Sequence, residues 1–367
     1  MSAGRVRVGV VGAGVISSQY LGNLTGFPDL EVVGVADLDE TRAAERAAEF
    51  GLPWSGSVDG LLAHDDVEIV VNLTIPAAHA EVAARALEAG KHVWNEKPFA
   101  LERSSALELL TLAEARGLRA ASAPDTFLGA GLQTAQRTVE SGAIGRPLTA
   151  LAVMQSAGPE RWHPNPDFFY LPGGGPLLDF GPYYVTALVQ LLGPVASVTA
   201  VDSTALDERV IAKGPRAGER VPVSTPTFHS ALLRFESGAS AQLVTSFQGW
   251  RTRAAMIEVS GVEGAIDVPN PNAFDGATAL WRRGVAEPET IAETGSTLTR
   301  GTGVVELARA IRAGVPERAS GALAYHVLDV LLSIVDAAET GDRVDVASTA
   351  ASPLLLPAGW DPAAATL

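Results

Sequence analysis

An apolar strand that runs straight into a glycine turn is the feature that most limits how this chain can fold. Residues Val6–Val11 form an alternating apolar pattern, and they lead into Gly12-Ala13-Gly14-Val15-Ile16-Ser17, where a helical pattern begins. A strand, a glycine turn and a helix in this order form the context that a dinucleotide-binding fingerprint requires. Gly12 would permit the tight turn, and Gly14 would let the backbone approach a pyrophosphate at the positive end of the helix. Ser17 replaces the third glycine of the fingerprint, a departure that weakens the match.

A second apolar strand, Glu31–Ala36, ends at Asp37. A carboxylate at this place can accept hydrogen bonds from both ribose hydroxyls of an adenosine, and it repels a 2′-phosphate. No arginine follows Asp37 immediately. We therefore expect NAD as the cofactor, with NADP the weaker ligand.

A lysine stands at the end of another short apolar run. Asn95-Glu96-Lys97-Pro98 follows His92-Val93-Trp94, and the carboxyl end of a strand is where open α/β sheets bind ligands. Taken alone, such a stretch is more often a surface turn that closes a βα unit. The glycine turn upstream and a second glycine block downstream change that balance in favour of a functional lysine.

The second glycine block is Gly173-Gly174-Gly175-Pro176-Leu177-Leu178-Asp179-Phe180-Gly181-Pro182-Tyr183-Tyr184. Three glycines let a backbone lie close to a ligand. Asp179 and Tyr183 stand four residues apart at the expected start of a helix, so they share one face of it. The alternative is a glycine-rich loop in which Asp179 caps the helix.

Together these stretches resemble the Gfo/Idh/MocA family of oxidoreductases, which includes inositol and glucose–fructose dehydrogenases. The resemblance covers nearly the whole chain, including the segment from Thr74-Ile75-Pro76 to His79. It implies that Lys97 binds the reacting oxygen and that Asp179 holds the substrate hydroxyl or the lysine. The cofactor contacts that it implies are Gly12, Gly14, Val15, Ile16, Asp37, Leu73, Thr74, Pro76, His79, Glu96 and Lys97.

The chain departs from the family where a histidine usually follows the aspartate by four residues, because Tyr183 stands there. A neighbouring ammonium such as that of Lys97 would favour the phenolate of Tyr183, which we expect to accept the substrate proton. His163 is the alternative base. It lies beside Trp162 in an aromatic, proline-stiffened loop, and we expect both to contact the substrate along with Lys97, Asp179 and Tyr183. His229 and His326 lie inside apolar patterns and are expected to be structural.

The 367 residues exceed the size at which single hydrophobic cores stop growing, which indicates two domains. Strands alternate with helices up to residue 123, as in a parallel, doubly wound Rossmann sheet, and residues 1–123 are expected to bind NAD(P). Strands then dominate residues 124–367, which predicts an α+β substrate-binding and oligomerisation domain with a large, mostly antiparallel open sheet. The stretches 205–222 and 269–300 are interpreted as excursions from that sheet.

Composition excludes several classes of function. A formal charge of −15 argues against nucleic acid or an anionic membrane as a partner. The absence of cysteine excludes disulfides and thiolate catalysis, and no histidine or carboxylate cluster has the spacing of metal ligands. No apolar stretch reaches the length of about 18 residues that a membrane span needs, so we expect a cytoplasmic protein.

The resemblance implies a sugar or inositol dehydrogenase that moves a hydride between a secondary alcohol and nicotinamide, working as a homodimer or homotetramer joined through the C-terminal sheet. Two alternatives stay open. One is a glycoside-cleaving enzyme that oxidises its substrate only transiently with bound NAD. The other is a non-catalytic NAD-binding sensor, although Lys97 and Asp179 count against it.

Overall fold

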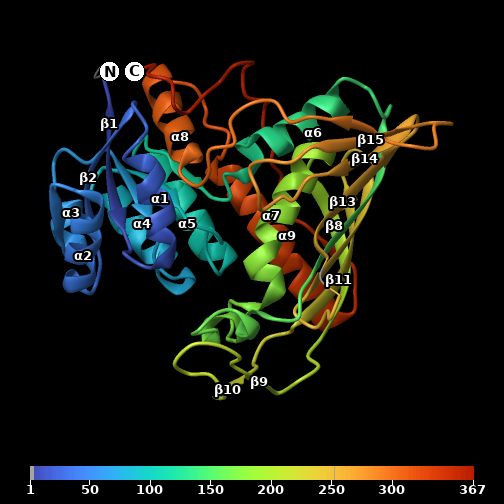
Figure 1. Ribbon diagram of the computed structural model, residues 1–367, viewed down its shortest axis with the longest axis horizontal. Coiled ribbons are helices and arrows are strands. Elements are labelled where there is room, and N and C mark those ends of the chain that lie inside the picture. Colours follow the sequence, from blue (N-terminus) through green and yellow to red (C-terminus); the bar gives the residue numbers. More distant parts are fainter. Residues whose placement is uncertain (1–3, 252) are drawn as a thin grey trace. The chain divides into compact units, whose positions relative to one another are not determined.

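The structure is a computed structural model that describes residues 4–251 and 253–367 (Figure 1). Contacts group the chain into two compact units. The first comprises the residues up to Gly129 with Gly295–Tyr325 and Leu356–Leu367, and the second comprises Ala130–Thr294 and His326–Leu355. The sequence-based boundary after residue 123 stays a prediction, and the contact-based units differ from it by grouping two late segments with the first unit.

A six-stranded sheet in the order β3-β2-β1-β4-β5-β6 forms the centre of the first unit. All its pairs are parallel, which confirms the predicted doubly wound architecture. The strands are β1 (Val6–Val11), β2 (Leu30–Ala36), β3 (Trp54–Gly56), β4 (Ile69–Asn72), β5 (His92–Asn95) and β6 (Ala120–Ser122). The helices are α1 (Val15–Leu24), α2 (Glu40–Phe50), α3 (Val58–Leu62), α4 (His79–Glu88), α5 (Arg103–Ala115) and α8 (Thr302–Ala313).

The strand order reverses between β1 and β4, because the chain continues from β1 to β2 on one side and returns to β4 on the other. Ligands of open α/β sheets bind at such a switch point, outside the carboxyl ends of the strands. Both strands are almost entirely buried, as helices on both faces of a parallel sheet require. The fold therefore directs attention to the residues that follow β1, β2, β4 and β5.

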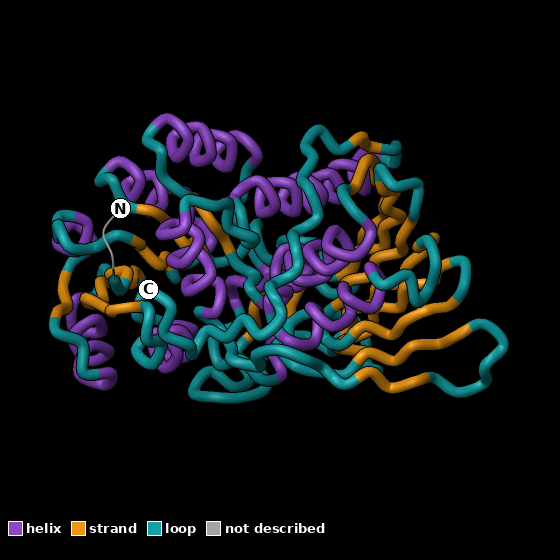
Figure 2. The backbone as a smooth tube through the Cα atoms, turned by 90° about the horizontal axis from the view of Figure 1, so that it is seen from above, coloured by secondary structure: helices purple, strands orange, loops and turns teal. Residues whose placement is uncertain are grey.

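The second unit contains a nine-stranded sheet in the order β16-β15-β14-β13-β7-β12-β11-β8-β17. Among the described strands of this sheet only β7 and β12 pair in parallel, so the sheet is mixed and mostly antiparallel, as predicted. Its strands are β7 (Pro147–Gln155), β8 (Val195–Ser203), β11 (Phe228–Phe235), β12 (Ser240–Ser246), β13 (Arg253–Gly261), β14 (Gly264–Val268), β15 (Thr278–Arg282), β16 (Glu289–Ile291) and β17 (Val344–Asp345). Figure 2 shows the helices of this unit, α6 (Ala130–Glu140), α7 (Gly175–Leu192) and most of α9 (Gly321–Thr340), on one side of the strands.

The two predicted excursions have different outcomes. Residues 205–222 do leave the large sheet, since β9 (Glu208–Val210) and β10 (Arg220–Pro222) pair only with each other. The prediction for 269–300 is wrong in part, because this stretch adds β15 and β16 to the large sheet. Both strands are short and carry exposed polar residues, so their apolar signal in the sequence is weak.

The expectation that no segment could span a membrane also needs a correction. Among the described residues, α9 has both the length and the mean hydropathy, 1.5, that a span requires. However, 61% of its apolar window is buried inside the protein. Such burial is typical of the core helix of a globular domain.

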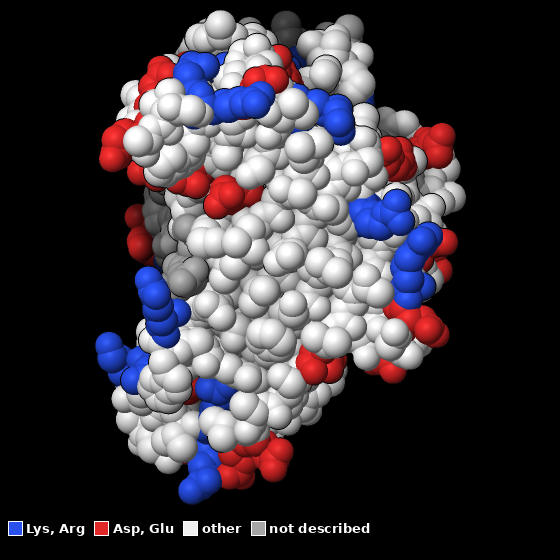
Figure 3. All heavy atoms as spheres, turned by 90° about the vertical axis from the view of Figure 1, so that its right-hand side faces the viewer, with Lys and Arg blue, Asp and Glu red and all other residues white. Residues whose placement is uncertain are grey.

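The face of the nine-stranded sheet that carries no helix is shown in Figure 3, where charged side chains are concentrated around the margin. Val201, Ser230, Val244 and Val153 lie side by side across β8, β11, β12 and β7. Leu232 is 55% exposed in the neighbouring row. An exposed surface of this kind marks a place where another molecule can bind.

Candidate functional site

The glycine turn after β1 is shaped by its contact with the loop after β4. Gly12 has a φ of 104°, and a Cβ at this position would lie 2.6 Å from the Leu73 carbonyl oxygen, so only glycine fits. A Cβ on Gly14 would meet no atom within 4 Å, which leaves that side of the turn open. The Ser17 hydroxyl donates to the Gly14 carbonyl over 2.6 Å. Serine thus supports the turn from within, which explains how it replaces the third glycine.

Asp37, at the end of β2, is held beside this turn. The Ala13 N–H donates to its Oδ2 over 2.7 Å, and the Asp39 N–H donates to its Oδ1 over 2.9 Å. These two bonds fix the carboxylate at the place where a ribose-binding residue is expected. The position of Asp37 could be predicted from the sequence, because it is the residue directly after β2.

Apolar side chains project into solvent around the same edge of the sheet. Val15, Leu38 and Ile75 are 84%, 96% and 70% exposed, and they follow β1, β2 and β4. Ile16, Thr74 and Pro76 are half-buried, whereas Leu73 is buried and contributes its carbonyl to the turn. The open Gly14 side, the fixed Asp37 carboxylate and this apolar edge together fit a dinucleotide cofactor.

Two buried asparagines organise the loops after β4 and β5. Asn72 Nδ2 donates to Asn95 Oδ1 over 2.6 Å and to the His79 carbonyl over 3.0 Å. The Asn72 Oδ1 accepts bonds from the backbone and the hydroxyl of Thr74, while Asn95 donates to the Phe99 carbonyl. Both amides are fully buried at strand ends, so they fix the positions of Thr74 and of the turn that contains Lys97.

His79 lies in a supporting position between two loops, and its expected contact with the cofactor stays a prediction. Its ring is 1% exposed, and its Nδ1 and Nε2 face the carbonyls of Pro98 and Thr74 at 2.7 and 3.0 Å. Burial lowers the pKa of the imidazole, although the two carbonyls oppose this. Because both ring nitrogens already have protein partners, His79 ties the loop after β4 to the residue that follows Lys97.

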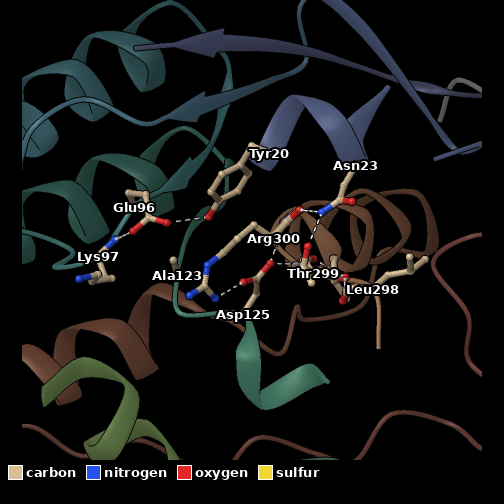
Figure 4. A network of polar contacts seen from close by, with 12 residues as sticks. Tyr20, Asn23, Glu96, Lys97, Ala123, Asp125, Leu298, Thr299 and Arg300 are labelled. Atoms are coloured by element: carbon tan, nitrogen blue, oxygen red, sulfur yellow. Dashed lines mark hydrogen bonds and ion pairs between the residues drawn. The ribbon is translucent and has the colours of Figure 1, made fainter. Parts of the chain in front are cut away.

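Glu96 and Lys97 occupy the carboxyl end of β5, as predicted. The Glu96 carboxylate accepts the Lys97 N–H over 2.8 Å through Oε2 and the Tyr20 hydroxyl over 2.9 Å through Oε1. In Figure 4 the Lys97 side chain points away from this carboxylate. Burial and the negative charge of Glu96 raise the pKa of the Tyr20 phenol well above its ordinary value, so it stays a donor. Trp94 Nε1 also donates to the Tyr20 oxygen, over 3.3 Å.

A buried charge pair, Asp125 and Arg300, is drawn in the same view (Figure 4). Asp125 accepts the N–H groups of Gly301 and Gly303 at 3.0 and 3.1 Å, and Arg300 Nη1 lies 3.5 Å from its Oδ1. Burial raises the pKa of the Asp125 carboxyl, and the positive charge of Arg300 opposes this. A Cβ on Gly303 would lie 2.1 Å from the Trp94 ring, so the segment before α8 fits closely against β5.

Sequence reasoning missed Tyr20, Asn72, Asn95, Asp125 and Arg300. The asparagines gave a readable signal, because each is a polar residue that ends an apolar strand. Asp125 and Arg300 gave none, since 175 residues separate them. No cluster of three or more metal-binding side chains occurs among the residues that the structure describes.

In the second unit, Asp179 and Tyr183 lie on α7, four residues apart on one face. The helix begins at Gly175 with Gly174 as its N-cap, which rules out the alternative of Asp179 as the cap. Asp179 is half-buried, and Tyr183 is 6% exposed. A Cβ on Gly174 would lie 2.4 Å from the Phe168 carbonyl oxygen, so this glycine lets the chain approach itself.

The loop before α7 holds Trp162 and His163 in an aromatic cluster. Trp162 is 59% exposed, and its ring meets those of His163 and Phe169 edge to face. The Asn165 N–H donates to His163 Nδ1 over 3.0 Å. The neutral imidazole therefore carries its proton on Nε2, which makes that atom a donor and disfavours His163 as a base.

The buried ion pair between Glu160 and Arg209 anchors this loop to the protein interior. Glu160 accepts the Tyr170 hydroxyl, and Arg209 Nη1 lies 3.4 Å from the other Glu160 oxygen. Arg209 also stacks on the Tyr170 ring at 5.6 Å and donates to the Phe247 carbonyl. All three side chains are at least 90% buried, so the exposed Trp162 stands on a rigid support.

Comparison with known proteins gives two family matches. The profile of an oxidoreductase family with an NAD-binding Rossmann fold matches residues 6–123, and that of the GFO/IDH/MocA C-terminal domain matches residues 132–267. A dTDP-3,4-didehydro-2,6-dideoxy-alpha-D-glucose 3-reductase from Saccharopolyspora spinosa is 30% identical over 77% of this chain and 81% of its own length.

Two further relatives match over shorter spans. The corresponding 3-reductase from Streptomyces antibioticus is 34% identical over 53% of this chain and 59% of its own length. Inositol 2-dehydrogenase 3 from Saccharopolyspora erythraea is 35% identical over 43% and 48%. The chain thus spans about half the length of these two relatives. Levoglucosan dehydrogenase in complex with NADH and L-sorbose shares the fold, with a TM-score of 0.82 over 94% of this chain and all of that one, at 22% identity.

Proposed function

Because the chain belongs to the Gfo/Idh/MocA family of oxidoreductases, we propose that it moves a hydride between nicotinamide and a secondary alcohol of a sugar or cyclitol. The observation that carries this proposal is the edge of the six-stranded sheet. There the glycine turn, the anchored Asp37 and Lys97 follow β1, β2 and β5. The relatives named as a dTDP-sugar reductase and an inositol dehydrogenase support a sugar-like substrate.

The proposed cofactor is NAD in preference to NADP. The backbone at Gly12 and Gly14 would hold the pyrophosphate, Asp37 the ribose hydroxyls, and the apolar edge the rings. The nicotinamide, when bound, supplies the hydride acceptor. A 2′-phosphate would bring a second negative charge close to Asp37, and this repulsion is the reason for the preference.

Lys97 is proposed to bind the reacting oxygen and to stabilise the negative charge that develops on it. Its backbone is fixed by Glu96, which Tyr20 holds in turn. Asp179 is proposed to hold a substrate hydroxyl. Trp162 would pack on an apolar face of the sugar, and the Nε2–H of His163 would donate to a hydroxyl.

A screen of sugars and inositols with free NAD tests this function. Net reduction of NAD in proportion to substrate supports a dehydrogenase. Glycoside cleavage without net reduction would favour transient oxidation instead. If NAD binds but no member of the panel is oxidised or cleaved, the sugar proposal is wrong, and if NAD does not bind, the cofactor proposal is wrong.

Tyr183 is proposed as the proton acceptor. The pH–rate profiles of wild type, Tyr183→Phe and His163→Ala test this role, because loss of the true base should flatten the basic limb and slow turnover by about 10²–10⁴-fold. A wild-type profile in Tyr183→Phe combined with a lost limb in His163→Ala would reverse the assignment.

A second copy of the chain is proposed to cover the helix-free face of the nine-stranded sheet. Its exposed Val201 and Leu232 would pack against their counterparts in a homodimer or homotetramer. Light scattering should find a smaller species for Val201→Lys with Leu232→Lys. The control Val210→Lys alters a valine on β9 that is 51% exposed and lies outside the large sheet, and it should leave the assembly unchanged. An unchanged mass in the double variant contradicts this interface.

A further inference from the structure

The loop before α7, residues 159–170, lies against the hairpin of β9 and β10 (Figure 1). Ala212, between the two strands, donates its N–H to the Glu160 carbonyl over 2.9 Å. A Cβ on Gly214 would lie 2.8 Å from the Pro164 Cβ, so the backbone of the hairpin turn packs directly on the loop. The hairpin is therefore in a position to control how the loop is held.

Arg216, in the same turn, reaches the middle of the loop. Its Nη1 and Nη2 donate to the two carboxylate oxygens of Asp167 over 2.6 and 3.0 Å. Its Nη1 also lies 3.4 Å from Asn165 Oδ1, and its Nε donates to Glu219 over 2.8 Å. Two parallel bonds from one guanidinium to one carboxylate fix the orientation of both groups. The hydrogen bonds from Arg216 hold the pKa of Asp167 below its ordinary value against the effect of burial, so the pair stays charged at neutral pH.

The two loop residues that this guanidinium contacts stand beside the side chains that are proposed to bind the sugar. The Asn165 N–H donates to His163 Nδ1 over 3.0 Å. Asp167 directly precedes Phe168, whose ring meets that of His163 edge to face at 5.4 Å. The Trp162 ring meets the other side of the same contact group, also 5.4 Å from the imidazole. The position of both rings thus depends on how the middle of the loop is held.

The ends and the middle of this loop are anchored differently. Glu160 and Tyr170, near its two ends, are buried. The side chains of Arg216 and Asp167 are 34% and 40% exposed. An exposed ion pair contributes little to the stability of a whole domain, so this pair can order the loop without being required for folding.

We propose that Arg216 is a positioning residue for sugar binding, because it holds the loop in the arrangement in which Trp162 and His163 meet the substrate. A loop that is already ordered loses less conformational entropy when the sugar binds. Lys97 and Tyr183 lie outside this loop, so Arg216 should affect KM rather than kcat. This inference rests on the proposed function and concerns what sets the substrate affinity of that site.

Hydrogen exchange of the full chain, followed by mass spectrometry without substrate, tests whether Arg216 orders the loop. In Arg216→Gln we expect the amides of residues 159–170 to exchange at least about threefold faster than in wild type. Arg220→Gln is the matched control, because it removes an arginine of the same hairpin that pairs with Glu208 at 2.7 Å, and it should leave the loop unchanged. Equal exchange in wild type and Arg216→Gln overturns the proposal.

Steady-state kinetics at saturating NAD, with a sugar that the wild type oxidises, test the consequence for binding. Arg216→Gln should raise KM about three- to tenfold and change kcat by less than about twofold, the scale of one well-formed exposed ion pair. Arg216→Lys should give an intermediate KM, because an ammonium keeps the charge but not the two parallel bonds. Asp167→Asn should raise KM to a similar extent, and the double variant should raise it no further.

Three kinetic results would contradict the proposal. They are a wild-type KM in Arg216→Gln, a loss of kcat without a change in KM, and effects of Arg216→Gln and Asp167→Asn that add in full. The control Arg220→Gln should keep both wild-type constants. Failure of the wild type to oxidise any sugar would instead overturn the proposed function.

Discussion

Lys97 is the single residue on which the proposed chemistry most depends. Lys97→Met keeps much of the apolar stem and removes the charge, so the variant should fold, bind NAD and turn over at least about a hundredfold more slowly, the effect of losing one transition-state donor. Lys213→Met is the matched control, because Lys213 is an exposed lysine of the second unit. Turnover of Lys97→Met within a few-fold of wild type would make the stretch around Lys97 a simple turn.

His229 should make the protein sensitive to mild acid. Its side chain is 4% exposed, and burial lowers its pKa to about 4, against a weaker opposing effect of Asp202. The unfolded chain takes up a proton near pH 6.5 while the folded chain does not, so stability is complete above that pH and falls toward pH 4, by roughly 3 kcal/mol.

Urea unfolding at several pH values measures this loss. His229→Leu should reduce the slope between pH 6.5 and 4. It should not abolish the slope, because burial also lowers the pKa of His92 to about 4. An identical slope in the variant would contradict the assignment to His229.

Among single residues, the sequence predicted those whose place in the site follows from their position at the end of a strand. Gly12 and Asp37 directly follow a strand, and Lys97 is the second residue after one, so the strand pattern was sufficient to locate them. The ion pairs of Arg42 and Arg300 could not be predicted in this way. Arg42 reaches Asp37 only after one helical turn, and Arg300 is 175 residues away from Asp125 in the sequence.

In the glycine turn, Gly12 is expected to matter for folding and Gly14 for cofactor binding. Gly12→Ala places a Cβ 2.6 Å from a backbone carbonyl at a positive φ, so it should destabilise the protein by at least about 1–3 kcal/mol. Gly14→Ala meets open space at a φ of −71°, so it should unfold like wild type.

The same Gly14 methyl group would project from the open side of the turn, where the cofactor is proposed to approach. Gly14→Ala should therefore weaken NAD binding by at least about tenfold, measured by calorimetry, while its urea midpoint stays within error of wild type. Unchanged NAD affinity would mean that the cofactor does not approach this side of the turn.

Elements with strong apolar periodicity were predicted to within one or two residues at most of their ends. The strands predicted over Val6–Val11 and Glu31–Ala36 are observed as β1 (Val6–Val11) and β2 (Leu30–Ala36). The strands β3, β15 and β16 were not predicted, because each has three to five residues and depends on its neighbours in the sheet. Their pairing depends on tertiary contacts, which a hydrophobic pattern of three to five residues does not predict.

For the molecule as a whole, the carboxylate of Asp29, directly before β2, connects this segment to Thr366 and Leu367. Asp29 is 1% exposed and accepts bonds from the Thr366 N–H, the Thr366 hydroxyl, the Leu367 N–H and Arg309 Nε, at 2.7–3.0 Å. Burial raises the pKa of Asp29, but these donors outweigh it, and the pKa lies below its ordinary value.

Asp29→Asn should lower the free energy of unfolding at pH 7 by about 2 kcal/mol, since it replaces charged acceptors by a neutral amide. The difference from wild type should vanish in strong acid, because a lowered carboxyl pKa contributes stability that is lost as the pH falls through it. Asp65→Asn, at an exposed aspartate, should change stability by less than about 0.5 kcal/mol. Equal effects of the two substitutions would deny Asp29 this role.

The first unit consists of three separate stretches of sequence, and this division constrains how it can form during synthesis. When the ribosome has made residue 129, Asp125 still lacks Arg300 and the N–H groups of Gly301 and Gly303. Asp29 likewise lacks its donors on Arg309, Thr366 and Leu367, which are translated later. The nascent cofactor-binding sheet therefore holds two carboxylates without their partners, and it can complete its core only after the residues of the second unit have been translated.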